Sequence, residues 1–129
     1  MARILIVDDD RDIVDSLTMV LEANEHAVEA KFDTDALESA VERIAPDLII
    51  LDIMFPEDPH AGFAAARSLK KNQALQHIPI LMLSAVNQRQ NMAFGFSDSD
   101  ISEDFMPVDG FVEKPVEPET LLTRIDELI

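Results

Sequence analysis

The sequence predicts an α/β fold in which strands and helices alternate five times around a parallel sheet. Short apolar runs recur along the chain, and the segments between them carry apolar residues at helical spacing. Several of the runs are continuous rather than alternating, which is typical of parallel strands buried on both faces. This alternation predicts right-handed crossovers and helices on both faces, which together form a doubly wound sheet.

The first half of the chain supplies the first three strands and two helices of this pattern. In order, we expect a strand at 4–7, a helix over about 11–24, a short weak strand at 27–30, a helix over about 36–44, and a strand that starts at 48 in "LIILDIMF". Asp33 and Thr34 are expected to lead into the second helix as capping residues. Asp10 and Asp12 are expected to be charges at the N-terminus of the first helix, where the helix dipole favours them.

The second half continues the alternation with one interruption. We expect a helix over about 61–73, a strand in "HIPILMLSA", a helix over 87–94, a last strand in "GFVEKP", and a final helix that starts at Pro118. The acidic segment 96–110 is too irregular for either element and is expected to be a long loop. It could be a docking element for a basic partner or a solvated insertion, and we slightly favour the insertion.

Composition limits the classes of function. The 129 residues match one domain, so we expect a single domain over residues 1–129 with no output domain in them. A net charge of −16 argues against direct binding to nucleic acid or to anionic membranes. The absence of cysteine, of a membrane-spanning run and of a signal peptide indicates a cytoplasmic protein without membrane insertion.

The functional signal is a group of polar residues that follow or end the apolar strands. Asp8 and Asp9 come directly after the first strand, Asp52 lies in the third, Ser84 ends the fourth, and Lys114 ends the fifth. In an open parallel sheet, ligands bind at the carboxyl ends of the strands, so these side chains are expected at one edge. Clustered carboxylates repel one another, and the cluster therefore requires a compensating partner.

A divalent cation is the partner that fits these residue types. Carboxylates without histidine or cysteine are hard oxygen ligands, which favour Mg²⁺ where a phosphate is also to be bound. A carboxylate can attack a phosphoryl group, so Asp52 is a candidate nucleophile. Ser84 and Lys114 would then hydrogen-bond and pair with the phosphoryl oxygens.

Four motifs, in order, resemble a known family. "ILIVDDD", "DLIILDIMFP", "PILMLSA" and "FVEKPV" are similar to the signatures of the receiver domain of two-component response regulators, and they cover nearly the whole chain. The resemblance implies a (βα)5 flavodoxin-like sheet with strand order 2-1-3-4-5. It also implies a phosphoacceptor that is not an enzyme, because the domain catalyses only its own phosphorylation and dephosphorylation.

By resemblance, Asp52 accepts the phosphoryl group from a sensor histidine kinase or a phosphotransfer protein. Asp9 would bind Mg²⁺ directly, and Asp8 directly or through water. Asp52 and the main-chain carbonyl of Met54 would complete the protein ligands. The resulting change in the surface would alter binding to a downstream protein that the sequence does not name.

The resemblance also assigns the residues that would bind the phosphoryl group and switch. Ser84 takes the family's Thr/Ser switch position, with Ala85 beside it in the same group, and Lys114 takes the place of its characteristic lysine. Phe111 replaces the switch aromatic, which is more often tyrosine. The bond before Pro115 is expected to be cis, as is usual in receivers.

Two alternatives stay open. The chain could be a non-phosphorylating adaptor that keeps the receiver fold. It could also be a Mg²⁺-dependent phosphatase that forms an aspartyl phosphate, although those enzymes carry a second aspartate two residues after the nucleophile, where this chain has Met54.

The stretch between Ser84 and Lys114 is also longer than is usual in receivers, and the excess falls in the acidic segment 96–110.

Overall fold

The computed structural model describes residues 2–52, 61–85, 108–114 and 116–129. The elements, in chain order, are β1 (Arg3–Val7), α1 (Arg11–Ala23), β2 (Ala27–Lys31), α2 (Leu37–Ile44), β3 (Leu48–Asp52), α3 (Ala61–Lys71), β4 (Ile80–Ala85), β5 (Gly110–Lys114) and α5 (Pro118–Leu128). The expected helix over 87–94, most of the acidic segment 96–110, Met54 and Pro115 lie outside the described residues. No helix in the described ranges has the length and apolar character that crossing a membrane requires.

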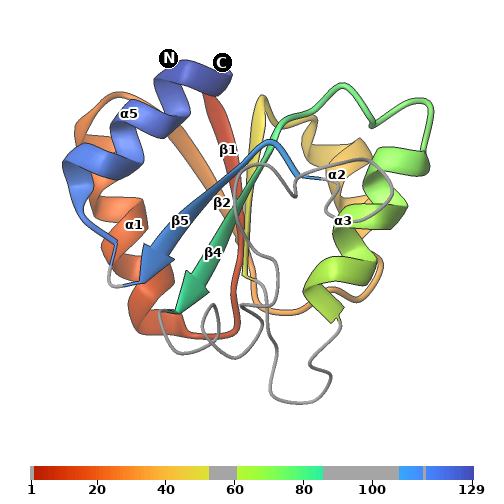
Figure 1. Cartoon of the computed structure of the whole chain (residues 1–129), viewed down its shortest axis with the longest axis horizontal. Helices are drawn as coiled ribbons and strands as arrows, with labels where there is room; N and C mark the ends of the chain where they lie inside the picture. The colour runs from red at the N-terminus through yellow and green to blue at the C-terminus, as the bar shows by residue number, and fades with distance from the viewer. Residues whose placement is uncertain (1, 53–60, 86–107, 115) are drawn as a thin grey trace.

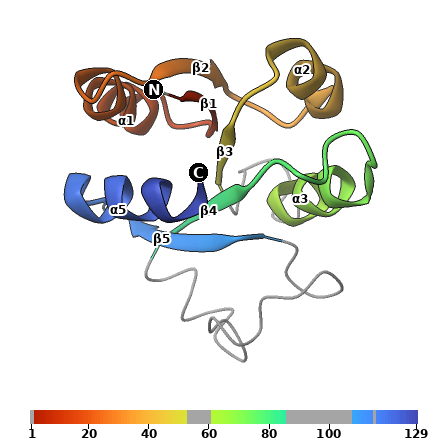
Figure 2. The same ribbon diagram turned by 90° about the horizontal axis from the view of Figure 1, so that it is seen from above.

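The five strands form one parallel sheet in the order β2-β1-β3-β4-β5. Helices α1 and α5 cover one face, and α2 and α3 cover the other (Figures 1 and 2). The predicted doubly wound fold and its strand order 2-1-3-4-5 are therefore confirmed. Because all strands run in one direction, their carboxyl ends share one edge of the sheet.

The core has two layers because successive side chains of a strand point to opposite faces. In β1, Leu5 and Val7 pack toward α2 and α3, whereas Ile4 and Ile6 pack toward α1 and α5. All four side chains are fully buried. This two-sided burial explains why β1 reads as a continuous apolar run in the sequence.

Helix α1 begins and ends with well-defined caps. The Asp10 carboxylate accepts hydrogen bonds from the backbone N–H groups of Asp12 and Ile13, as an N-cap does, which agrees with the expected helix-terminal role of Asp10. At the other end, the His26 N–H donates to the Leu21 carbonyl and the Glu25 N–H donates to the Glu22 carbonyl. These two bonds form a Schellman motif.

Glu25 occupies the position of that motif where glycine is usual, and its φ of 69° lies in the left-handed region. We expect Glu25→Gly to raise the free energy of unfolding by about 0.5–1 kcal/mol, because glycine adopts this conformation without the clash of a Cβ atom. Chemical denaturation measures the change. The matched control Glu22→Gly, inside the helix, should destabilise by a similar amount, and a loss of stability in Glu25→Gly would contradict the expectation.

The entry to α2 differs from the expectation. The helix starts at Leu37, and the N-cap position is Ala36, which has a φ of 50° and makes no side-chain capping bond. Asp33 and Thr34 therefore do not cap the helix, and this prediction was wrong. The Asp33 carboxylate instead accepts hydrogen bonds from Lys31 Nζ (2.8 Å) and from the Asp35 N–H (3.0 Å), so a local turn competes with capping.

Asp109 forms an anchor at the start of β5, at the end of the segment expected to be an irregular loop. Its N–H donates to the Ile80 carbonyl, and its Oδ2 accepts from the Ile80 N–H and from Lys70 Nζ, both at 2.8 Å. Lys70 Nζ also donates to the carbonyls of Gln76 and Ile78. This network joins the end of α3 to the starts of β4 and β5.

Candidate functional site

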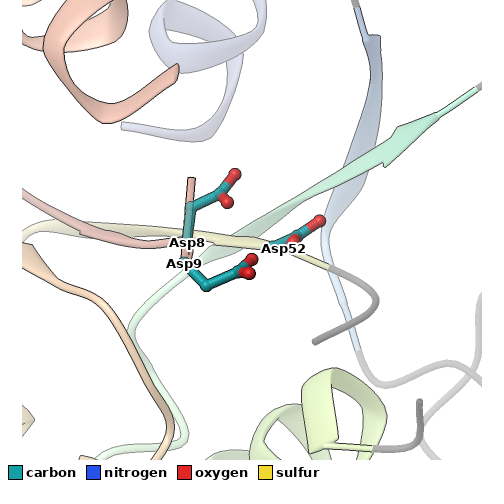
Figure 3. A group of neighbouring side chains, drawn as sticks. All are labelled: Asp8, Asp9 and Asp52. Atoms are coloured by element: carbon teal, nitrogen blue, oxygen red, sulfur yellow. The ribbon is translucent and has the colours of Figure 1, made fainter. Parts of the chain in front are cut away.

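Three carboxylates gather at the carboxyl edge of the sheet. Asp8 and Asp9 follow β1, and Asp52 is the last residue of β3 (Figure 3). One carboxylate oxygen from each residue lies within 4.8 Å of the others. The structure therefore brings together the acids that the sequence predicted would meet, although more than 40 residues separate Asp52 from the other two.

The sheet register explains this proximity. Val7 pairs with Leu51, so the next residues along the chain, Asp8 and Asp52, lie at the same level at the carboxyl ends of neighbouring strands. Asp8 is tied down further, because its N–H donates to the Lys31 carbonyl of β2 (3.1 Å) and its Oδ1 accepts from the Asp10 N–H (2.9 Å). Asp8 and Asp52 are buried, and Asp9 is exposed.

Burial raises the electrostatic cost of bringing these carboxylates together. Like charges repel, and the two buried carboxylates have also lost most of their hydration. A cation held among the three oxygens would offset both costs. The set consists of hard oxygen donors, two buried and one open to solvent, and so it fits Mg²⁺ better than a softer metal.

Another carboxylate, that of Asp33, follows the neighbouring strand β2 and has a different partner. Hydrogen bonds from Lys31 Nζ and from the Asp35 N–H hold the pKa of Asp33 below its ordinary value of 3.8. Lys31 Nζ is thereby occupied at Asp33, 2.8 Å away, while the backbone carbonyl of Lys31 supports Asp8. Because the charges of Lys31 and Asp33 cancel, this pair adds no net charge next to the acidic cluster.

The other predicted site residues end the neighbouring strands. Ser84 pairs in register with Glu113 and Ala85 with Lys114, one and two positions beyond the Asp52–Leu83 pair. The backbones of Ser84, Ala85 and Lys114 thus reach the same edge as the acids. Phe111 lies earlier in β5, and its side chain is buried in the core layer under α2 and α3. The roles of these residues stay predictions.

Comparison with known families agrees with this geometry. The sequence model described as the response regulator receiver domain matches residues 4–126. The chain belongs to this family. It is therefore a receiver domain of two-component signal transduction, as its four motifs predicted.

Curated relatives of the receiver are longer proteins. It is 33% identical over 129 residues to the DNA-binding dual master transcriptional regulator RpaA of Synechocystis, covering 100% of this chain and 49% of RpaA. It is 33% identical over 127 residues to the phosphate regulon transcriptional regulatory protein PhoB of Pseudomonas aeruginosa, covering 98% of this chain and 51% of PhoB. The receiver thus spans about half the length of these relatives.

Solved structures share the receiver's fold. The receiver domain of NtrX from Brucella abortus aligns with a TM-score of 0.78 and 27% identity over 97% of this chain and 96% of that one. Chemotaxis protein CheY4 of Vibrio cholerae aligns with a TM-score of 0.79 and 25% identity over 100% of this chain and 99% of that one.

One contact near the carboxyl edge of the receiver's sheet was not predicted from the sequence. The guanidinium carbon of Arg11 lies 4.1 Å from the centre of the Phe32 ring. Arg11 starts α1 directly after the acids, and Phe32 follows the last residue of β2. The sequence places Arg11 and Phe32 after two strands that are neighbours in the predicted order. It gives no further sign that the two side chains meet.

Proposed function

We propose that this receiver accepts a phosphoryl group on Asp52 from the phosphohistidine of a sensor histidine kinase or a phosphotransfer protein. The observation that supports it best is the cluster of Asp8, Asp9 and Asp52 within 4.8 Å at the carboxyl edge of the sheet. Family membership and the resemblance of the receiver to response regulators support a donor of this kind.

In the proposed reaction, a carboxylate oxygen of Asp52 attacks the phosphorus atom. The O–P bond forms, the P–N bond to the donor imidazole breaks, and the imidazole leaves with the electron pair and takes up a proton. The position of Asp52 at the end of a buried strand holds the nucleophile rigidly and close to solvent-exposed Asp9. The resemblance to response regulators assigns the phosphoacceptor role to Asp52 and leaves Asp8 and Asp9 as metal ligands.

Asp8, Asp9 and Asp52 would hold Mg²⁺ through carboxylate oxygens, with the Met54 carbonyl as a further proposed ligand. When bound, the ion neutralises the negative charge that the acids and the phosphoryl oxygens bring together. Ser84 and Lys114 are proposed to bind the phosphoryl oxygens from the ends of β4 and β5, with Ala85 in the same group. The bond before Pro115 is proposed to be cis.

The new charge would shift a two-state equilibrium toward a conformation with a different binding surface. Phe111 is proposed as the aromatic switch residue. Because phenylalanine lacks a hydroxyl group, it would signal through the extent to which its ring is buried. The output would be altered binding of a downstream protein.

Intact-mass measurement after incubation with acetyl phosphate tests the proposal. We expect one phosphoryl adduct on the native chain in Mg²⁺, none in EDTA, and none on Asp52→Asn in either condition. Asp15→Asn, which changes an exposed aspartate of α1, is the matched control and should be phosphorylated like the native chain. If the native chain binds Mg²⁺ but never gains the adduct, the non-phosphorylating adaptor replaces the phosphoacceptor as the better account.

A further inference from the structure

The three acids of the cluster are not held equally well. Asp52 is held as the last residue of β3. Asp8 is buried, and its N–H and its Oδ1 both form hydrogen bonds. Asp9 is exposed, and within the described ranges of the chain no hydrogen bond or ion pair fixes its carboxylate. The position of Asp9 therefore depends on the backbone of the loop between β1 and α1.

Among the described residues, two links join that loop to the end of β2 and the residue that follows it. The first is the backbone hydrogen bond from the Asp8 N–H to the Lys31 carbonyl. The second is the stacking of the Arg11 guanidinium over the Phe32 ring at 4.1 Å. Asp9 lies between them, because Asp8 and Lys31 precede Asp9 and Phe32 directly, and Arg11 follows two residues later. The two links thus bracket the loop that carries Asp9.

We propose that Arg11 and Phe32 are a positioning pair that holds the β1–α1 loop in the arrangement in which Asp9 can bind a divalent cation. The inference rests on the proposed metal site and adds two residues to it. Neither residue touches the cation in this account; they act through the loop. Cation–π attraction suits this role because it fixes a charged side chain against a ring without occupying a carboxylate of the cluster.

Because Arg11 is positively charged, the direction in which Mg²⁺ affinity changes when Arg11 is removed tests the proposal. A positive side chain close to a cation site weakens cation binding by repulsion, so electrostatics alone predicts that removing Arg11 tightens Mg²⁺ binding. Positioning predicts the opposite, since the loop loses its second link. Among the described residues Arg11 forms no ion pair, so its removal leaves no acid there without a partner.

Isothermal titration calorimetry with Mg²⁺, and electron paramagnetic resonance with Mn²⁺ as a probe, measure the affinity directly. The chain has no tryptophan or tyrosine, so intrinsic fluorescence is a poor reporter here. We expect Arg11→Met and Phe32→Leu each to weaken Mg²⁺ binding by about two- to fivefold, which corresponds to an exposed cation–π pair. The double variant should bind Mg²⁺ no more weakly than either single variant, because both substitutions remove the same contact.

Two further variants separate positioning from general stability. Phe32→Tyr keeps an aromatic ring and should retain the native affinity. Arg43→Met removes an exposed charge from the last turn of α2 and should leave the affinity unchanged. The free energy of unfolding of each variant is also measured in EDTA, so that a loss of stability without metal is not counted as a loss of affinity.

The outcomes distinguish this inference from the proposed function. Tighter Mg²⁺ binding in Arg11→Met, or native affinity in Phe32→Leu, overturns the positioning pair and leaves the metal site intact. A native chain that binds neither Mg²⁺ nor Mn²⁺ more strongly than Asp52→Asn overturns the metal site and the pair together.

Discussion

Asp8→Asn is expected to stabilise the metal-free receiver while removing most of the stabilisation that Mg²⁺ provides. The substitution keeps an oxygen that can accept from the Asp10 N–H, and the new amide can donate to the neighbouring carboxylates. Removing one of three clustered charges should raise the free energy of unfolding in EDTA by about 1–3 kcal/mol. Functional acids are commonly arranged at such a cost to stability.

Denaturant unfolding with and without Mg²⁺ measures both halves of this prediction. At a Mg²⁺ concentration tenfold above the dissociation constant, the native receiver should gain about 1.4 kcal/mol, whereas Asp8→Asn should gain much less. Asp15→Asn removes an exposed charge from α1 and should behave like the native chain in both conditions. An Asp8→Asn variant that is less stable in EDTA, or that keeps the full Mg²⁺ effect, would show that the cluster is not a strained cation site.

Asp109→Ala is expected to lower the free energy of unfolding by about 2–3 kcal/mol. The substitution removes the acceptor for the Ile80 N–H and for Lys70 Nζ, two hydrogen bonds of 2.8 Å. Lys70 is only 16% exposed at its side chain, so its ammonium group loses its anionic partner where water replaces it poorly. The start of β5 also loses its side-chain link to α3 and one of its two hydrogen bonds to Ile80, while the backbone bond from the Asp109 N–H to the Ile80 carbonyl remains.

The exposed pair of Arg124 and Glu127 provides the control for this second prediction. These side chains lie 3.4 Å apart on α5 and are about half exposed. Glu127→Ala should change the free energy of unfolding by less than about 0.5 kcal/mol, because exposed ion pairs contribute little. Equal effects of the two substitutions in urea denaturation would mean that the Asp109 network is no more than a surface ion pair.

The main features of the fold follow from patterns that the sequence displays openly. Ile4 to Val7 and Leu48 to Leu51 are apolar throughout because both faces of β1 and β3 are covered, and such runs are hard to confuse with edge strands. The acidic cluster was predictable for a related reason. Parallel strands place their carboxyl ends together, so acids at the ends of neighbouring strands can meet even when they are far apart in the chain.

What the sequence did not reveal depends on details that no local pattern encodes. Glu25, Ala36 and Ala45 adopt positive φ angles although none is glycine or asparagine, so the usual signal for a helix terminus was missing. Asp33 is a good capping residue by type, but Lys31 and a local turn use its carboxylate instead. Asp109 appeared to belong to an acidic loop because its partners, Ile80 of β4 and Lys70 of α3, lie far from it in the chain.

The position of the phosphoryl group on the chain tests the central claim most directly. The receiver is phosphorylated with acetyl phosphate in Mg²⁺, the acyl phosphate is reduced with borohydride, and the peptides are mapped by tandem mass spectrometry. We predict that the reduced residue is Asp52 alone, because the proposed function gives it the role of phosphoacceptor and makes Asp8 and Asp9 metal ligands only. Reduction at Asp8, at Asp9 or at an acid outside the cluster would contradict the account.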